Sequence, residues 1–227
     1  MITNPNVKLN LGLNILRKRE DGFHDLETLF VPYFGIHDTL EIVVGDDYSR
    51  TSAALFAKYA SDMIAQGISA DGRLMITIAR AEGVDWDPLK DLTAKAYYIL
   101  AEDFKLPPVK IFLEKTSPVG AGLGGGSSDA AFALKMLNEL CSLDLTQEQL
   151  AAYAAELGSD CAFFIYNSPM RGQGRGEILT PYDIDLSSYT IQVVTPAGIS
   201  VSTKDAYGGI RPHLPELPLT EDRKSVV

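Results

Sequence analysis

The residues best able to do chemistry in this chain lie in one glycine-rich stretch, residues 118–131. Five glycines between positions 120 and 126 are followed by Ser127 and Ser128, and then by an apolar run that favours a helix. Glycine has no Cβ, so its backbone N–H group can lie directly against a ligand. Where such a loop enters a helix, the unpaired amides and the helix dipole favour an anion, typically a phosphate. We therefore expect a phosphate-binding loop, in which the serine hydroxyls cap the helix, contact phosphate or ligate Mg²⁺.

The residues beside the glycines argue against two common classes of phosphate loop. A loop of the G-x-x-x-x-G-K-[ST] type has a lysine next to its hydroxyl residue, and no lysine adjoins the two serines here. The glycine spacing also matches the G-x-G-x-x-G pattern of dinucleotide-binding folds. In those folds the loop leaves its strand directly, whereas residues 114–118 separate the strand expected at 109–113 from the first glycine. The dinucleotide-binding interpretation is therefore rejected.

The segment PVGAGLGGGSSDAA, residues 118–131, resembles the second motif of the small-molecule kinases named after galactose, homoserine, mevalonate and phosphomevalonate. The resemblance implies an ATP-dependent kinase with an alcohol group as acceptor, and it implies Mg²⁺ as the companion of ATP. No side chain is assigned as a dedicated metal ligand. The residues that the resemblance places around ATP are Pro118, Gly120, Gly122, Leu123, Gly124, Gly125, Gly126, Ser127 and Ser128.

Two further segments carry the residues that this resemblance makes catalytic. Residues 7–15 alternate between apolar and polar side chains, which predicts a half-buried strand with Lys8 and Asn10 side by side on its polar face. Such a lysine is usually solvated, but the segment resembles the family's first motif. The resemblance implies that Lys8 stabilises developing charge and that Asn10 orients the acceptor. By its position Asp160 is an ordinary turn residue, but residues 157–160 resemble the segment that carries the family's catalytic base.

The segment DGFHDL, residues 21–26, resembles the cytidine-binding segment of one branch of the family. The resemblance implies that His24 hydrogen-bonds the cytosine, that Phe23 covers its face and that Tyr207 completes the stack. The branch commonly has Tyr where this chain has Phe23, so the stacking surface is kept and a hydroxyl is lost. The implied acceptor is a cytidine diphosphate-linked methylerythritol, phosphorylated on its 2-hydroxyl in a step of non-mevalonate isoprenoid precursor synthesis.

Composition limits the choice of partners and of compartment. The chain has 227 residues and a formal net charge of −10, which argues against nucleic acid or an anionic membrane as partner. Cys141 and Cys161 lack the spacing of a metal site. There is no signal-peptide pattern and no apolar run of membrane-spanning length. We expect a cytoplasmic enzyme, monomeric or weakly dimeric, whose partner is its small-molecule substrate.

The hydrophobic pattern predicts an α+β chain. Expected strands cover residues 7–15, 26–33, 39–44, 74–79, 109–113, 161–165 and 189–195. Expected helices cover residues 52–66, 88–103, 127–141 and 147–157, with a short helix ending at Tyr207. Thr146 and Gln149 form a capping-box pattern at the start of the helix at 147–157.

The resemblance also implies a two-domain fold. Residues 1–157 would form a ribosomal protein S5-like, nucleotide-binding domain. Residues 158–227 would form an incomplete ferredoxin-like domain, because the family's third glycine-rich motif has no counterpart in the chain. The family's Asp-Asn-Leu tripeptide, which helps to hold adenine, here reads Lys90-Asp91-Leu92. A carboxylate cannot donate as an amide does, so that contact is in doubt.

Two alternatives remain open at this stage. The chain could be a different kinase of the same superfamily, acting on a sugar, homoserine or mevalonate; residues 21–26 argue against this, because those acceptors have no cytosine. It could also be a nucleotide-binding homologue without activity, since the third motif is missing. The presence of Lys8, Asp160 and the intact loop argues against the second alternative.

Overall fold

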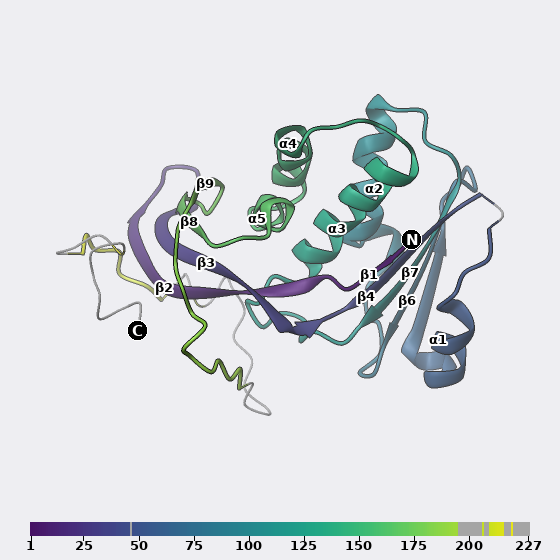
Figure 1. The fold of residues 1–227 in the computed structure, drawn as a ribbon, viewed down its shortest axis with the longest axis horizontal. Helices are drawn as coiled ribbons and strands as arrows, with labels where there is room; N and C mark the ends of the chain where they lie inside the picture. The colour runs from purple at the N-terminus through teal and green to yellow at the C-terminus, as the bar shows by residue number, and fades with distance from the viewer. Residues whose placement is uncertain (46, 195–205, 207–208, 216–218, 220–227) are drawn as a thin grey trace.

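The computed structural model describes residues 1–45, 47–194, 206, 209–215 and 219. Within these residues the chain forms two sheets with helices between and beside them (Figure 1). No helix in this part of the chain has both the length and the apolar character needed to cross a membrane. Tyr207 and residues 201–205, for which a capped short helix was expected, lie outside the described residues.

The first sheet has five strands in the order β1-β4-β7-β6-β5. All neighbours are antiparallel except β6 and β7, which run parallel. A parallel pair needs a crossover connection, and the helix α2 supplies it. The strands and this helix are β1 (Ile2–Thr3), β4 (Thr39–Val44), β5 (Ile64–Ile68), β6 (Leu74–Arg80), β7 (Val109–Lys115) and α2 (Leu92–Asp103).

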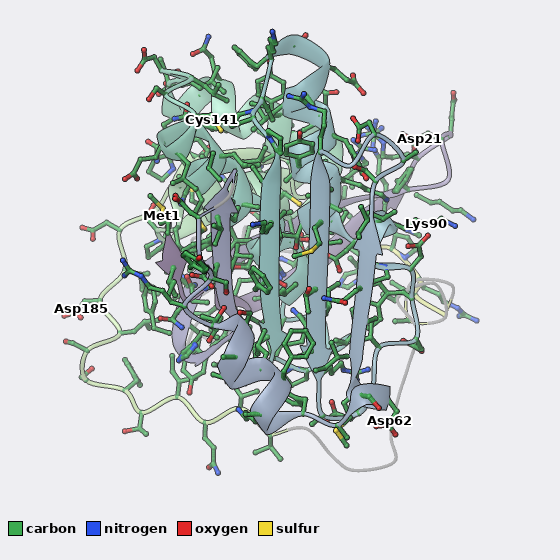
Figure 2. All side chains as sticks on the ribbon, turned by 90° about the vertical axis from the view of Figure 1, so that its right-hand side faces the viewer. Met1, Asp21, Asp62, Lys90, Cys141 and Asp185 are labelled. Atoms are coloured by element: carbon green, nitrogen blue, oxygen red, sulfur yellow. The ribbon has the colours of Figure 1, made fainter. Side chains whose placement is uncertain are left out.

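Both faces of the five-stranded sheet carry buried side chains, and the period-two pattern of its strands decides which side chain faces which layer. On β7, Ile111 and Leu113 join the main core beneath α2 and α3 (Gly125–Leu140), whereas Phe112 joins a smaller core beneath α1 (Ser52–Lys58). Figure 2 shows this sheet broadside, with α1 lying across one end of its outer face.

The second sheet has four antiparallel strands in the order β2-β3-β8-β9. It consists of two hairpins, one from each end of the described chain, and their strands are β2 (Asn6–Lys18), β3 (His24–His37), β8 (Met170–Gly174) and β9 (Ile178–Pro181). Gly22, with φ +86°, lies in the turn of the first hairpin. A register shift at Gly12, with φ +72°, interrupts the alternation expected over residues 7–15, and Leu13 is consequently 45% exposed.

The remaining helices pack between the sheets. Helix α4 (Gln147–Leu157) begins at the expected capping box, in which Thr146 and Gln149 bond each other's backbone N–H groups. One-turn helices η1 (Ser61–Met63) and η2 (Pro88–Lys90) precede β5 and α2. The predicted elements at 39–44, 74–79, 109–113 and 147–157 are confirmed within two residues.

Three predicted elements are wrong. Residues 161–165 form the helix α5 (Cys161–Tyr166) and not a strand; all five side chains are buried, and an apolar run buried on every side has no period that separates the two structures. The helix predicted at 52–66 ends at Lys58, because β5 pairs along β6. Residues 189–194 form no strand, and residue 195 lies outside the described part.

Candidate active site

The glycine loop has the geometry of an anion site. Gly120, Gly122 and Gly124 have φ of +74°, +74° and +72°, a region that residues with a Cβ rarely adopt. Gly124 is the N-cap of α3, so the unpaired N–H groups of the first turn face the loop. A pocket of about 520 Å³ opens here, lined by residues 118–127, by Trp86 and Asp91 before α2, and by Asp160.

Lys8 joins the second sheet to this loop. Its backbone N–H donates to the carbonyl of Leu123 at 2.9 Å. Its side chain is buried, and Nζ donates to Oδ1 of Asn10 at 2.7 Å, as expected for neighbours on one strand face. Nζ also lies 3.3 Å from Oδ2 of Asp160 and 4.8 Å from the ring centroid of Phe30. The two residues predicted to be catalytic are therefore paired at the edge of the pocket.

Asp160 owes its position to α5. It precedes the first residue of that helix and makes no capping hydrogen bond, so its carboxylate is not used to cap the backbone. The side chain is 30% exposed and lines the pocket. Phe163 and Phe164 of the same helix are fully buried, and Phe163 packs against Phe30 of β3 with ring centroids 5.4 Å apart. The carboxylate is thus held on a well-anchored element.

A buried ion cluster joins the two ends of the glycine loop. Lys115, at the end of β7, donates through Nζ to Oδ2 of Asp38 and, at 2.7 Å, to Oδ2 of Asp129 in the first turns of α3. Asp38 also accepts from the backbone N–H of Thr116 at 2.6 Å, and from the N–H and hydroxyl of Ser117 at 2.7 Å each. The three charged side chains are at most 6% exposed. The loop therefore starts and ends on one network.

The charges in this cluster shift one another's ionisation. Burial by itself would lower the pKa of Lys115, but the charges of Asp129 and Asp38 outweigh it and raise the pKa. Burial raises the pKa of Asp129 well above its ordinary value, and Lys115 opposes this shift. The ammonium group of Lys115 is consequently held in its charged form between Asp38 and Asp129.

The sequence missed this cluster. Lys115 and Asp38 were not singled out, because a lysine at the end of a strand and an aspartate before one look like ordinary surface residues. The alternation on β7 was the available signal: Ile111 and Leu113 face the core, and Lys115 continues the same face. An inward-facing lysine needs buried partners, which could have been sought among the aspartates.

The structure separates the two serines of the loop. Ser127 is half-buried and lines the pocket, whereas Ser128 is fully buried, does not line it, and its Oγ has no hydrogen-bond partner among the described residues. Asp91 caps α2: its Oδ1 accepts from the N–H of Thr93 at 2.8 Å and its Oδ2 from Nε1 of Trp86 at 3.0 Å. Its position as a helix cap explains why a carboxylate stands there.

Two of the residues assigned to the cytosine, Phe23 and His24, lie apart from the pocket. Phe23 and His24 are at the tip of the β2–β3 hairpin, where His24 pairs with Lys18, while Lys8 pairs with Pro32 further along the ladder. Phe23 is 55% exposed and His24 is half-buried. The structure thus brings Lys8, Asn10, Asp160 and the loop together, and it places the hairpin pair at the far end of the same two strands.

The chain is similar to proteins of known class. Residues 91–168 match the GHMP kinases N terminal domain. A 4-diphosphocytidyl-2-C-methyl-D-erythritol kinase of Bacteroides fragilis is 46% identical over 97% of this chain and 72% of its own length. One of Cytophaga hutchinsonii is 38% identical over 96% and 71%. The crystal structure of a 4-(cytidine 5'-diphospho)-2C-methyl-D-erythritol kinase superposes with a TM-score of 0.66 at 28% identity, covering 97% of this chain and 69% of that one.

The phosphate loop at a helix start, the paired lysine and aspartate, and the matched domain together define a GHMP kinase, an enzyme that uses ATP to phosphorylate an alcohol. A solved homoserine kinase has the same fold, with a TM-score of 0.56 at 15% identity. Within this class the chain belongs to the family of 4-diphosphocytidyl-2-C-methyl-D-erythritol kinases.

The ion cluster generates a prediction about stability. Lys115→Met leaves two buried carboxylates without their cation, so it should lower the free energy of unfolding by about 3–5 kcal/mol. Urea unfolding measures the change. Lys58→Met is the matched control, because Lys58 pairs with Glu114 at the neighbouring position while 61% exposed; it should cost at most about 1 kcal/mol. Equal losses in the two variants would show that the cluster has no special role.

The loop generates a second prediction. Gly122→Ala adds a methyl group in open space at the pocket, since no atom lies within 4 Å of the new Cβ, and it strains a backbone with φ +74°. Gly72→Ala has the same strain at φ +69° and the same open space, but in the β5–β6 turn away from the pocket. Both should lose about 1–2 kcal/mol of stability. Only Gly122→Ala should raise KM for ATP, measured by steady-state kinetics. The same KM for ATP in both variants would contradict a phosphate-binding loop.

Gly125 is a less informative position for this test, because a Cβ on Gly125 would lie 2.4 Å from Oγ of Ser117 and would disturb the fold as well.

Proposed function

We propose that this chain transfers the γ-phosphoryl group of ATP to the 2-hydroxyl of 4-diphosphocytidyl-2-C-methyl-D-erythritol, a step in non-mevalonate isoprenoid precursor synthesis. The observation that supports the mechanism is the contact between Nζ of Lys8 and Oδ2 of Asp160, 3.3 Å apart at the edge of the phosphate pocket. The names of the relatives support the acceptor. They favour this activity over another kinase of the superfamily and over a homologue without activity.

In the proposed mechanism the loop holds ATP and the paired side chains act on the acceptor hydroxyl. The backbone N–H groups of residues 122–127 bind the β- and γ-phosphates at the start of α3, whereas the N–H of Ser128 already donates to the carbonyl of Gly124. Asp160 accepts the proton of the attacking hydroxyl, and Lys8 stabilises the oxygen that attacks and the phosphoryl group in transfer. Asn10, whose Nδ2 is fixed by Oγ1 of Thr28 at 3.0 Å, orients the acceptor.

Mg²⁺ would neutralise charge on the ATP phosphates. The part of the chain that the structure describes has no group of three or more His, Cys, Asp or Glu side chains arranged for a metal. This fits Mg²⁺, which is usually held by the phosphates, by water and by one or two protein oxygens. The hydroxyl of Ser127, which lines the pocket, is the protein group that would hold it. Ser128 is buried, and its backbone N–H donates to the carbonyl of Gly124 at 2.9 Å, so it would serve the site by closing the first turn of α3 and not by binding phosphate itself.

At the acceptor end, we propose that His24 hydrogen-bonds the cytosine and that Phe23 stacks on it, with Tyr207 on the opposite face.

We also propose the domain limits 1–157 and 158–227, with ribosomal protein S5-like and ferredoxin-like folds. The pairing of β8 with β3 means that these two parts share a sheet. A cytoplasmic protein, monomeric or weakly dimeric and without a nucleic-acid partner, accords with ATP as substrate and with the net charge of −10.

The test of the mechanism is the replacement of the base. Asp160→Asn should lower kcat about 10²–10⁴-fold, the range for loss of a general base, while ATP still binds. ADP release with 4-diphosphocytidyl-2-C-methyl-D-erythritol as acceptor measures turnover. Asp62→Asn is the control, because Asp62 is an exposed aspartate in η1 that does not line the pocket (Figure 2). Near-normal turnover in Asp160→Asn would remove this residue from the mechanism.

The acceptor assignment has its own test. His24→Ala should weaken binding of the cytidine-containing acceptor by about 1–3 kcal/mol, because a polar edge of the base loses its partner. KM values for acceptor and ATP should be measured separately, together with melting temperature. A rise in KM for the acceptor alone supports the assignment. An equal loss of ATP affinity would place His24 on the ATP side instead.

A further inference from the structure

The tips of the two hairpins of the second sheet meet at Phe23. Arg175 lies in the turn between β8 and β9, and its Cζ is 4.9 Å from the centroid of the Phe23 ring. The hairpins come from opposite ends of the described chain and lie side by side in the same sheet (Figure 1). Arg175 is 41% exposed, and Phe23 remains 55% exposed under it. An aromatic ring has two faces, so a guanidinium on one of them leaves the other for a ligand.

The β8–β9 turn holds Arg175 in place through its backbone. Gly174 and Gly176 have φ of +68° and +109°, which lets the chain reverse around Arg175. The carboxylate of Glu177 accepts from the backbone N–H of Arg175, and the N–H of Gly176 donates to the carbonyl of Gln173 at 3.0 Å. None of these bonds uses the guanidinium. The side chain can therefore be replaced without removing the bonds that form the turn.

The guanidinium of Arg175 makes a longer ion pair than the guanidinium groups of Arg17 and Arg19 on the β2–β3 hairpin. Arg19 donates to Asp21 and Asp25 at 3.0 Å each, and Arg17 is also paired with Asp25. Arg175, in contrast, has its Nε 3.7 Å from Oε1 of Glu177. An incoming anion would therefore displace a weaker partner from Arg175 than from Arg17 or Arg19.

The proposed acceptor requires a cation in this region. Its diphosphate joins the cytosine, placed at Phe23 and His24, to the methylerythritol, placed at Lys8 and Asp160. Lys8 is already paired with Asp160, and the chain as a whole has a net charge of −10. A guanidinium offers planar, paired N–H donors that match phosphate oxygens, and it also stacks on aromatic rings.

On the basis of the proposed function, we propose that Arg175 is an acceptor-binding residue whose guanidinium pairs with the diphosphate of the acceptor. From the same position it supports the ring of Phe23 on which the cytosine stacks. Recognition of the acceptor is then divided between two hairpins: β2–β3 binds the base, and the β8–β9 turn binds the diphosphate. This arrangement would favour a cytidine diphosphate compound over a cytidine without phosphate.

The experiment compares inhibitors that differ only in phosphate. Cytidine, CMP and CDP are tested as competitors of the acceptor on wild type, Arg175→Gln and Arg175→Lys. Arg175→Gln should raise Ki for CDP about 10–100-fold, the loss expected for a charged hydrogen bond, and should change Ki for cytidine less than about threefold. Arg175→Lys should recover part of the CDP affinity, because it restores the charge without the planar donors. KM for ATP should not change.

Arg17→Gln is the matched control, since Arg17 is 75% exposed, lies on the β2–β3 hairpin that carries Phe23 and is already paired with Asp25. It should leave the ratio of the cytidine and CDP inhibition constants unchanged. Equal weakening of cytidine and CDP in Arg175→Gln, or no weakening of either, would overturn the proposal. A wild-type protein that does not phosphorylate the cytidine acceptor would instead refute the proposed function, so the two failures are distinguishable. Melting temperatures of the Arg175 variants should match wild type, because the bonds of the turn remain.

Discussion

The interaction on which the site depends is the buried contact of Lys115 with Asp38 and Asp129. Glycines give the phosphate loop its shape through three residues at positive φ, but they give it no rigidity of their own. Lys115 and Asp38 fix the chain just before the loop, and Asp129 fixes the helix just after it. Amides that must meet a transferring phosphoryl group are useful only if they are already aimed when charge develops. The cluster holds the loop in one conformation. It buries three charged side chains, and this burial is tolerated only because each charge lies against an opposite charge.

A second constraint joins the acceptor side to the ATP side. Lys8 belongs to the second sheet, yet its backbone N–H binds the loop at Leu123 and its side chain reaches Asp160. A Cβ on Gly124 would lie 3.3 Å from Cε of this lysine and 3.0 Å from the ring of Phe164. Strand β2, the glycine loop and helix α5 therefore meet with no room for a further carbon. Since phosphoryl transfer depends mainly on positioning, this close packing is itself a functional feature.

The sequence predicted the glycine loop and the pairing of Lys8 with Asn10, but it did not predict the ion cluster, and the reasons are physical. The glycine loop could be found because no ordinary turn needs five glycines, and the contact between Lys8 and Asn10 followed from strand periodicity. The ion cluster could not be found, because Lys115 and Asp38 are 77 residues apart and charge alone does not reveal burial. Ser127 and Ser128 look equivalent in the sequence, but successive residues of a helix face different directions, and only Ser127 reaches the pocket.

The wrong assignment at residues 161–165 matters for the mechanism. A strand there would have placed Asp160 in a flexible turn before a sheet. The helix α5 instead anchors it through Phe163 and Phe164, which are buried between the glycine loop and β3. Lys135 of α3 donates to the carbonyl of Phe164 at 2.7 Å and so ties α5 to the helix that carries the phosphate site. The position of Asp160 relative to the glycine loop is therefore set by helix packing, which tolerates little displacement. In the proposed mechanism, a carboxylate held in this way would keep its alignment with the acceptor hydroxyl while ATP enters and ADP leaves.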